Sequence, residues 1–148
     1  MGRKIVSPTQ RATRSIVNSS SSGSSLDTIQ SMPSSKSVTS GAVTANTLVQ
    51  VLSVTGSGYL TASAIQCVDA TARTLRLQII IDGVTAYDAT TAAISSNLSG
   101  IIAVGLYNGT NSIPAVPGVR FNQSIVINTA SSLTETGKQT YFYAYNTE

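Results

Sequence analysis

The side chains that could do acid–base or nucleophilic chemistry are few in this chain. There is no histidine, so no serine or cysteine has an imidazole to activate it. A Ser-Lys pair that uses Lys36 or Lys138 stays open, although neither lysine lies in an apolar run that would lower its pKa. Cys67 lies in a mostly apolar run, which predicts a buried, inert thiol. The sequence therefore predicts no catalytic residues and no enzyme.

The acids are spaced too widely to work together. A glycosidase needs two carboxyl groups about 5–9.5 Å apart. The best pair is Asp82 and Asp88, which the strand spacing would separate by roughly 17 Å. A metal ion needs several oxygen ligands in one place, whereas Asp69 and Glu135 also stand alone in the sequence. We expect no metal site and no cofactor, with one structural calcium between loops as the open alternative.

Four cations near the N-terminus form the first candidate partner-binding group. They are Arg3, Lys4, Arg11 and Arg14. Such side chains could contact an acidic protein surface or neutralise the phosphates of a nucleic acid. No aromatic residue lies between them for bases to stack on, so an acidic protein surface is the preferred partner and nucleic acid the alternative.

Three tyrosines near the C-terminus form the second candidate group. Tyr141, Tyr143 and Tyr145 alternate along a predicted strand, so they share one of its faces. Tyrosines in this arrangement can pack against a neighbouring strand or subunit, with their hydroxyls at the rim. Stacking against a sugar is the alternative. We therefore expect a subunit-packing face or a ligand face here.

The N-terminal cations belong to an arm that differs in composition from the rest of the chain. Residues 1–40 hold five of the nine cations, one acid and the serine-rich run 19–25, while residues 41–148 hold four cations and five acids. A polar segment of this kind buries too little apolar surface to offset its ordering entropy. We expect an extended arm at residues 1–40, ordered only by a partner, and one folded domain at residues 41–148.

Charge is scarce in the whole chain. Only 10% of the residues are charged, against the about 25% that is usual in soluble proteins. A surface this poor in charge is usually covered, which favours a homo-oligomer or a shell component. No apolar run approaches the roughly 18 residues of a membrane helix, and no secretion signal follows Met1. We expect a protein made in a cytosol, with no membrane partner.

The folded domain has the period-two pattern of β-strands. Strands are predicted near residues 43–54, 59–68, 75–81 with a hairpin partner, 101–107, 119–129 and 139–145. Seven or eight short strands separated by turn residues predict a single all-β sandwich. The pattern leaves jelly-roll and immunoglobulin-like topologies open.

One hairpin can be predicted in detail. Asp82-Gly83 follows an alternating apolar run and predicts a two-residue type I′ turn. This turn would pair Ile81 with Val84, Ile79 with Ala86 and Leu77 with Asp88 on one face, with Ile80 opposite Thr85 and Gln78 opposite Tyr87 on the other.

The domain resembles a known class of proteins. The segments that carry the resemblance are Ser40-Gly41-Ala42-Val43 through Val54-Thr55-Gly56-Ser57-Gly58, and Arg73-Thr74-Leu75-Arg76-Leu77 with the Ile81-Asp82-Gly83 turn. They are similar to small β-sandwich virion proteins of tailed bacteriophages, which serve as capsid decoration (cement) proteins, head fibres, or tail and collar components. The resemblance covers residues 40–148 and is one of style, with low charge and strands rich in Ser, Thr, Ala and Val.

The resemblance implies a structural function in a virion. A cement protein would clamp neighbouring subunits of the major capsid protein, or other virion proteins, with its arm. A tail, collar or fibre component that binds a receptor or carbohydrate is the alternative, and a bacterial carbohydrate-binding module comes third. The expected location is the virion, after synthesis in the host cytoplasm.

Overall fold

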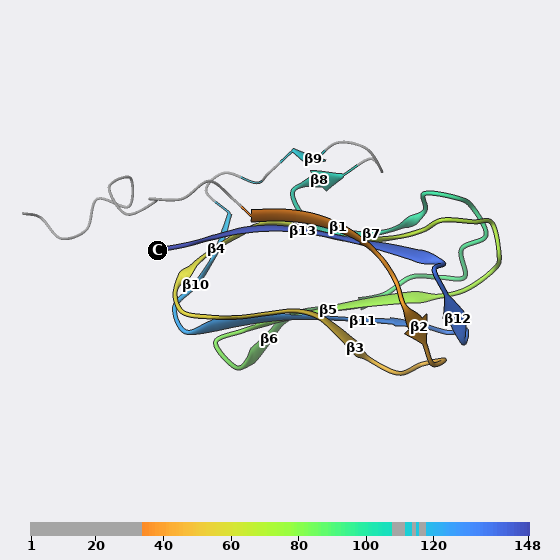
Figure 1. Ribbon diagram of the computed structural model, residues 1–148, viewed down its shortest axis with the longest axis horizontal. Helices are drawn as coiled ribbons and strands as arrows, with labels where there is room; N and C mark the ends of the chain where they lie inside the picture. The colour runs from red at the N-terminus through yellow and green to blue at the C-terminus, as the bar shows by residue number, and fades with distance from the viewer. Residues whose placement is uncertain (1–33, 108–111, 114, 116–117) are drawn as a thin grey trace, which may run out of the picture.

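The computed structural model describes residues 34–107, 112–113, 115 and 118–148. Every regular element in this part of the chain is a β-strand, and most strands belong to two sheets that face each other across a core (Figure 1). The predicted all-β sandwich is therefore confirmed. The described part of the chain contains no helix of the length and hydropathy that crossing a membrane requires.

The first sheet has five strands and the second has four. The first contains, in spatial order, β1 (Ser34–Thr39), β13 (Gln139–Thr147), β4 (Gly58–Cys67) and, one after the other along the outer edge of β4, β10 (Val119–Phe121) and β7 (Gly100–Val104). The second contains β3 (Val49–Thr55), β11 (Ser124–Ser131), β5 (Leu75–Ile81) and β6 (Val84–Thr90). Two short pairs are β2 (Ala42–Val43) with β12 (Glu135–Thr136), and β8 (Leu106–Tyr107) with β9 (Ser112–Ile113).

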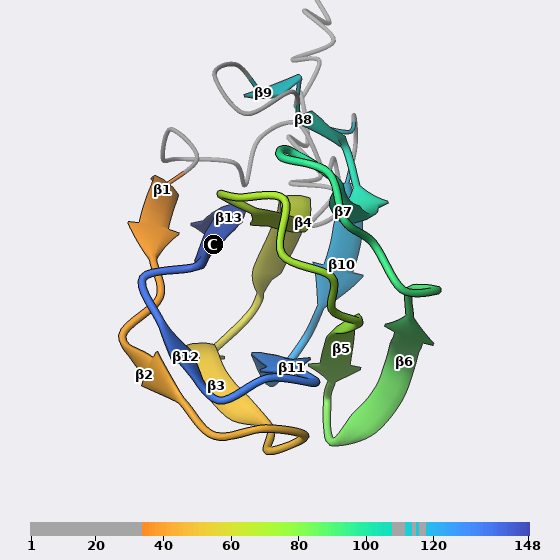
Figure 2. The same cartoon turned by 90° about the vertical axis from the view of Figure 1, so that its right-hand side faces the viewer.

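The strand order is that of a jelly roll. β10 and β7 pair with successive parts of β4, and between them the N–H of Ala115 donates to the carbonyl oxygen of Thr61 at 2.8 Å, so they count as one interrupted edge strand. The strands are then nested in antiparallel pairs: β1 with β13, β3 with β11, β4 with β7 and β10, and β5 with β6. One long hairpin folded over into two sheets gives this pairing, which distinguishes a jelly roll from an immunoglobulin-like sandwich. Figure 2, which looks along the strands, shows the two layers.

Alternation along the strands decides which side chains enter the core. In β5, Leu75, Leu77 and Ile79 are buried between the sheets, while Arg76 and Gln78 lie on the outer face. Large apolar side chains from both sheets complete the core, among them Leu60, Ile65, Phe121, Ile125 and Ile127. Burial of each such side chain stabilises the fold by about 1.5–3 kcal/mol.

The hairpin between β5 and β6 has the predicted turn. Asp82 and Gly83 have φ angles of 52° and 79°, and a type I′ turn requires positive φ at both positions. Ile81 pairs with Val84, as predicted. This turn is the tip of the long hairpin from which the jelly roll is folded.

Beyond the turn, the predicted register is wrong. A bulge follows the first two pairs, so Ile79 pairs with Tyr87 instead of Ala86. The predicted pair of Leu77 with Asp88 is displaced in the same way. One extra residue in a strand moves all later side chains to the opposite face. Tyr87 therefore faces the core, and Asp88 lies on the outer face of the sheet.

Three predicted strands are interrupted in the structure. The segment 43–54 becomes β2 and β3, separated by residues 44–48, and the segment 101–107 becomes β7 and β8. The segment 119–129 becomes β10 and β11, which belong to different sheets. Its apolar alternation continues across the break, but the turn at residues 122–123 carries the chain from one sheet to the other.

The sandwich also begins earlier than composition predicted. β1 lies within residues 1–40, which composition assigns to the arm, and it pairs along its whole length with β13. The two strands lie at opposite ends of the sequence, so no local pattern predicted their pairing. The boundary between arm and sandwich therefore lies before Ser34.

Candidate functional site

The structure fixes where the arm joins the sandwich. Ser34 begins β1 opposite Tyr145 of β13. Figure 1 shows the start of β1 and the C-terminus at the same end of the molecule. The candidate cations of the arm, Arg3, Lys4, Arg11 and Arg14, lie outside the described residues. Their role in binding a partner stays a prediction.

Arg120 holds the C-terminus at this end of the sandwich. Its guanidinium donates to both carboxylate oxygens of Glu148, at 2.9 and 3.0 Å. It also donates to the Tyr59 hydroxyl and to the side-chain oxygen of Asn122, each at 2.9 Å, and lies 5.4 Å from the centre of the Tyr59 ring. All three nitrogens of Arg120 are engaged. This arginine is therefore a structural clamp and not a free binding cation.

An ion cluster closes the opposite end of the sandwich. Arg73 is 2% exposed and pairs with Asp69 and with Glu135, whose Oε2 lies 3.2 Å from Arg73 Nε. Lys138 Nζ lies 3.1 Å from Asp69 Oδ2. Hydrogen bonds from Lys138 and from the N–H of Thr71 hold the pKa of Asp69 at about 2. Two acids and two cations neutralise one another here, and they join the loop that follows β4 to β12 and to the turn before β13.

The fold brings together two acids that the sequence analysis treated as isolated. Asp69 and Glu135 stand alone in the sequence, but the fold brings both to one guanidinium. Glu135 Oε1 also accepts hydrogen bonds from Ser131 at 2.7 Å and Gln139 at 2.6 Å. Within the described residues, no group of three or more His, Cys, Asp or Glu side chains could hold a metal ion. Nearby Cys67 is buried, as predicted, and burial raises the pKa of its thiol.

The outer face of the second sheet carries another pair. Asp88 accepts two hydrogen bonds from Arg76, at 2.7 and 2.6 Å, and one from Gln78 at 2.9 Å. These bonds, above all those from Arg76, hold the pKa of Asp88 at about 2. Asp88 can reach Arg76 only because the bulge in β6 places it on the outer face.

Asp82 has a second role that its sequence context did not reveal. Its carboxylate oxygen Oδ1 accepts hydrogen bonds from the backbone N–H groups of Asn122, Gln123 and Ser124, at 3.0, 2.7 and 3.0 Å. The bonds from Ser124 and Gln123 are the main cause of its lowered pKa. Asp82 thus joins the hairpin tip to the turn between β10 and β11. These groups lie about forty residues apart in the sequence, so no local pattern could predict the contact.

The sandwich balances its charges internally. After Gly41, each acid contacts a cation or backbone N–H groups, and each cation is paired with an acid; the cations are Arg73, Arg76, Arg120 and Lys138. With Lys36 included, residues 34–148 hold five cations and five acids. The chain's net charge of +3 therefore belongs entirely to residues 1–33.

The three candidate tyrosines face the interior. Tyr141 and Tyr143 are 5% and 9% exposed and belong to the core, and Tyr145 packs against it. The Tyr141 hydroxyl donates to Gln139 Oε1 at 2.8 Å. The tyrosines share one face, as their alternation predicts, but it is the inner face. Tyr141 and Tyr143 are therefore too buried to form the expected subunit-packing or ligand face, and Tyr145 is half-buried against the core.

Comparisons with known proteins place the chain in no family. No family model matches the sequence, and no curated protein matches it. Among solved structures, a chain from "Structure of infectious bursal disease virus Gt strain" is 17% identical, with a TM-score of 0.32 over 76% of this chain. This protein spans 31% of that chain. A TM-score this low does not establish a common fold, so the jelly roll rests on the strand order alone.

Proposed function

We propose that this protein is a non-enzymatic virion structural protein, namely a capsid decoration (cement) protein that holds neighbouring capsid subunits together through its N-terminal arm. The resemblance to small phage virion proteins supports this role. So does the jelly roll, which occurs in viral capsid domains. The same fold also occurs in lectins and cupins, so the fold does not determine the function, and the charges and surfaces of the sandwich have to distinguish between these roles.

The observation that carries the proposal is the internal charge balance of the sandwich. Within residues 41–148 no acid is left without a partner, so the +3 arm finds no free counter-charge there. A second copy would present the same balanced surface. A binding partner of the arm would therefore be a different molecule with an acidic surface, and in this proposal it is the capsid.

The alternative, a tail, collar or fibre component with a sugar site, has lost its specific support. That hypothesis needed an exposed aromatic face, but Tyr141 and Tyr143 are in the core and Tyr145 packs against it. A receptor-binding role through other surfaces has no comparable observation in its favour.

Attachment to purified capsids tests the arm directly. Replacement of Arg3, Lys4, Arg11 and Arg14 by Gln should weaken attachment by about tenfold or more, because several exposed ion pairs are lost together. Added salt should weaken the wild type in the same direction. The matched control replaces Arg3, Arg11 and Arg14 by Lys, which keeps the charge and should keep most of the affinity. Equal attachment of the Gln variant would contradict the proposal.

A second comparison separates an acidic protein surface from nucleic acid. An arm that docks on protein should attach equally to DNA-free and DNA-filled shells of the same expanded form. An arm that binds DNA should prefer filled shells, and its log affinity should fall by about 0.9 per contacted phosphate for each log unit of salt. Attachment to filled shells alone would make nucleic acid the partner.

A further inference from the structure

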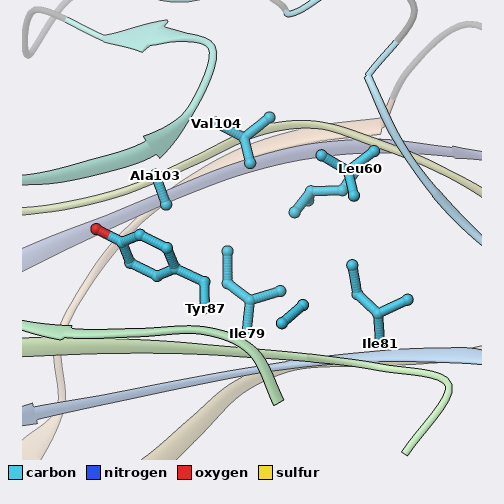
Figure 3. Close-up of a pocket in the computed structure, with 8 residues that line it drawn as sticks. Leu60, Ile79, Ile81, Tyr87, Ala103 and Val104 are labelled. Atoms are coloured by element: carbon cyan, nitrogen blue, oxygen red, sulfur yellow. The ribbon is translucent and has the colours of Figure 1, made fainter. Parts of the chain in front are cut away.

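An apolar pocket opens between the two sheets at the edge formed by β6, β7 and β10 (Figure 3). Its volume is about 160 Å³. Leu60 and Ile79 form its buried floor, and Val119, which is 40% exposed, lies at its mouth. Ala86 and Ala103 also line it, and their short side chains leave the space open. The bulge in β6 contributes to the pocket because it turns Tyr87 inward beside Ile79.

The lining restricts what this pocket can hold. All eight lining residues are apolar except for the hydroxyl group of Tyr87. A sugar or a charged group would find almost no hydrogen-bond partners there. A comparable apolar cavity, of about 150 Å³, stays dry and accepts one benzene molecule. The volume therefore fits one branched aliphatic or aromatic group, and is too small for a long acyl chain.

A suitable apolar group lies beside the pocket on the same hairpin. Val84 follows the Asp82-Gly83 turn and is 69% exposed, the highest value among the large exposed apolar side chains of the described residues. Its partner across the hairpin is Ile81, which lines the pocket. An exposed apolar side chain beside an apolar pocket makes the surface self-complementary, because the side chain of one copy can enter the pocket of another. Two copies related by a two-fold axis could each insert Val84 into the pocket of the other.

The edge strand gives an independent reason to expect a cover. The outer edge of β6 pairs with no described strand. β6 has seven residues, no proline and no lysine, and its one charged side chain, Asp88, is neutralised by Arg76. Apart from the bulge near the hairpin turn, this edge therefore lacks the features that protect edge strands, and such edges tend to pair with another chain. The balanced charge of the sandwich also means that two sandwiches would not repel each other.

We propose that the β6 edge is a self-association surface, on which Val84 of each protomer occupies the apolar pocket of a second copy. This contact is separate from the arm and does not depend on attachment to a particle. The low charge content of the chain led us to expect a homo-oligomer. The proposed contact makes it a two-fold dimer with its interface at the β6 edge.

Sedimentation of the free full-length protein over a wide range of concentration tests the proposal. We expect a concentration-dependent dimer. Val84→Ala empties the pocket of the partner, and Ala86→Leu fills the pocket from within; each should raise the dimer dissociation constant by about tenfold or more. The control is Leu98→Ala, because Leu98 is 56% exposed and lies outside the pocket and the hairpin. It should change the constant by less than about twofold. Thermal unfolding of each variant checks that the monomer remains folded.

Mixing the two weakened variants gives a sharper test. In the mixed dimer, Val84 of the Ala86→Leu protomer enters the open pocket of the Val84→Ala protomer, as in the wild type. At the second contact, the shortened side chain of the Val84→Ala protomer lies against the filled pocket of the Ala86→Leu protomer. The mixed dimer should therefore be tighter than either homodimer. A monomer at every concentration, a dimer that neither substitution weakens, or a mixed dimer no tighter than the homodimers would each overturn the proposal. So would a pocket that binds benzene in a protein that stays monomeric.

Discussion

Single carboxylates hold together parts of this protein that lie far apart in the sequence. Asp82 supplies a positive φ at the hairpin tip and also binds the turn between β10 and β11. Asp69 links Arg73 to Lys138 at the opposite end of the molecule. Each acid is therefore required in its ionised form, because the protonated form would lose its cation or some of its N–H donors.

Stability should fall at acid pH through Asp69 and Asp88. Their pKa values are about 2 in the folded protein, against 3.8 as the ordinary value. The unfolded chain therefore binds more protons between about pH 5 and pH 2, so stability is full above this window and falls as the pH falls through it. Asp88→Asn should make the decline shallower, as measured by urea midpoints across this range. An unchanged slope would show that the pair of Asp88 with Arg76 contributes nothing to the pH dependence.

At the level of elements, β4 is the strand on which the first sheet depends. It pairs with β13 on one side and with β10 and β7 on the other, and all ten of its residues are buried. Its first residue, Gly58, is closely approached by the carbonyl oxygen of Asn146 and by the ring of Phe121. A side chain has no room at this point.

Gly58→Ala should therefore destabilise the protein. The added Cβ would meet the backbone of Asn146, which cannot move without breaking the pairing of β4 with β13. We expect a loss of about 1–3 kcal/mol in denaturant unfolding. Gly41→Ala is the matched control, because a Cβ at Gly41 meets nothing within 4 Å. If both variants unfold at the same denaturant midpoint, the close approach at Gly58 does not affect the free energy of unfolding.

The elements also show what the sequence could predict. The Asp82-Gly83 turn was predictable because two adjacent residues determine it. The bulge that pairs Tyr87 with Ile79 was not, because a register without a bulge also places apolar residues opposite each other, such as Ile79 and Ala86. Alternation showed that Tyr141 and Tyr143 share a face, but period two does not distinguish an inner face from an outer one. Likewise, the choice of a jelly roll depended on pairs such as β1 with β13, which no local pattern encodes.

At the level of the whole molecule, β1 completes one edge of the first sheet. It is an edge strand whose one described neighbour is β13. The strand covers the outer edge of β13, which carries core tyrosines on its inner face. We therefore expect the sandwich to require β1, but not the residues before Ser34, for its stability.

Two truncations should separate the arm from the sandwich. Deletion of residues 1–33 should leave the melting temperature almost unchanged, because all described strands remain. Deletion of residues 1–39 removes the six pairs between β1 and β13, and should lower the melting temperature by more than about 5 °C. Calorimetry of the two truncated proteins makes the comparison. Equal melting temperatures would mean that β1 does not stabilise the sandwich.

The charge balance has a consequence for the colloidal behaviour of the protein. The sandwich carries no net side-chain charge, so residues 1–33 supply the net charge that opposes non-specific aggregation of the free protein, whether monomer or dimer. A folded protein without its arm would be near its isoelectric point in neutral buffer and prone to precipitate. When an acidic surface neutralises the arm, the repulsion from this net charge disappears. Docked copies could then crowd side by side at a density that free copies would not reach.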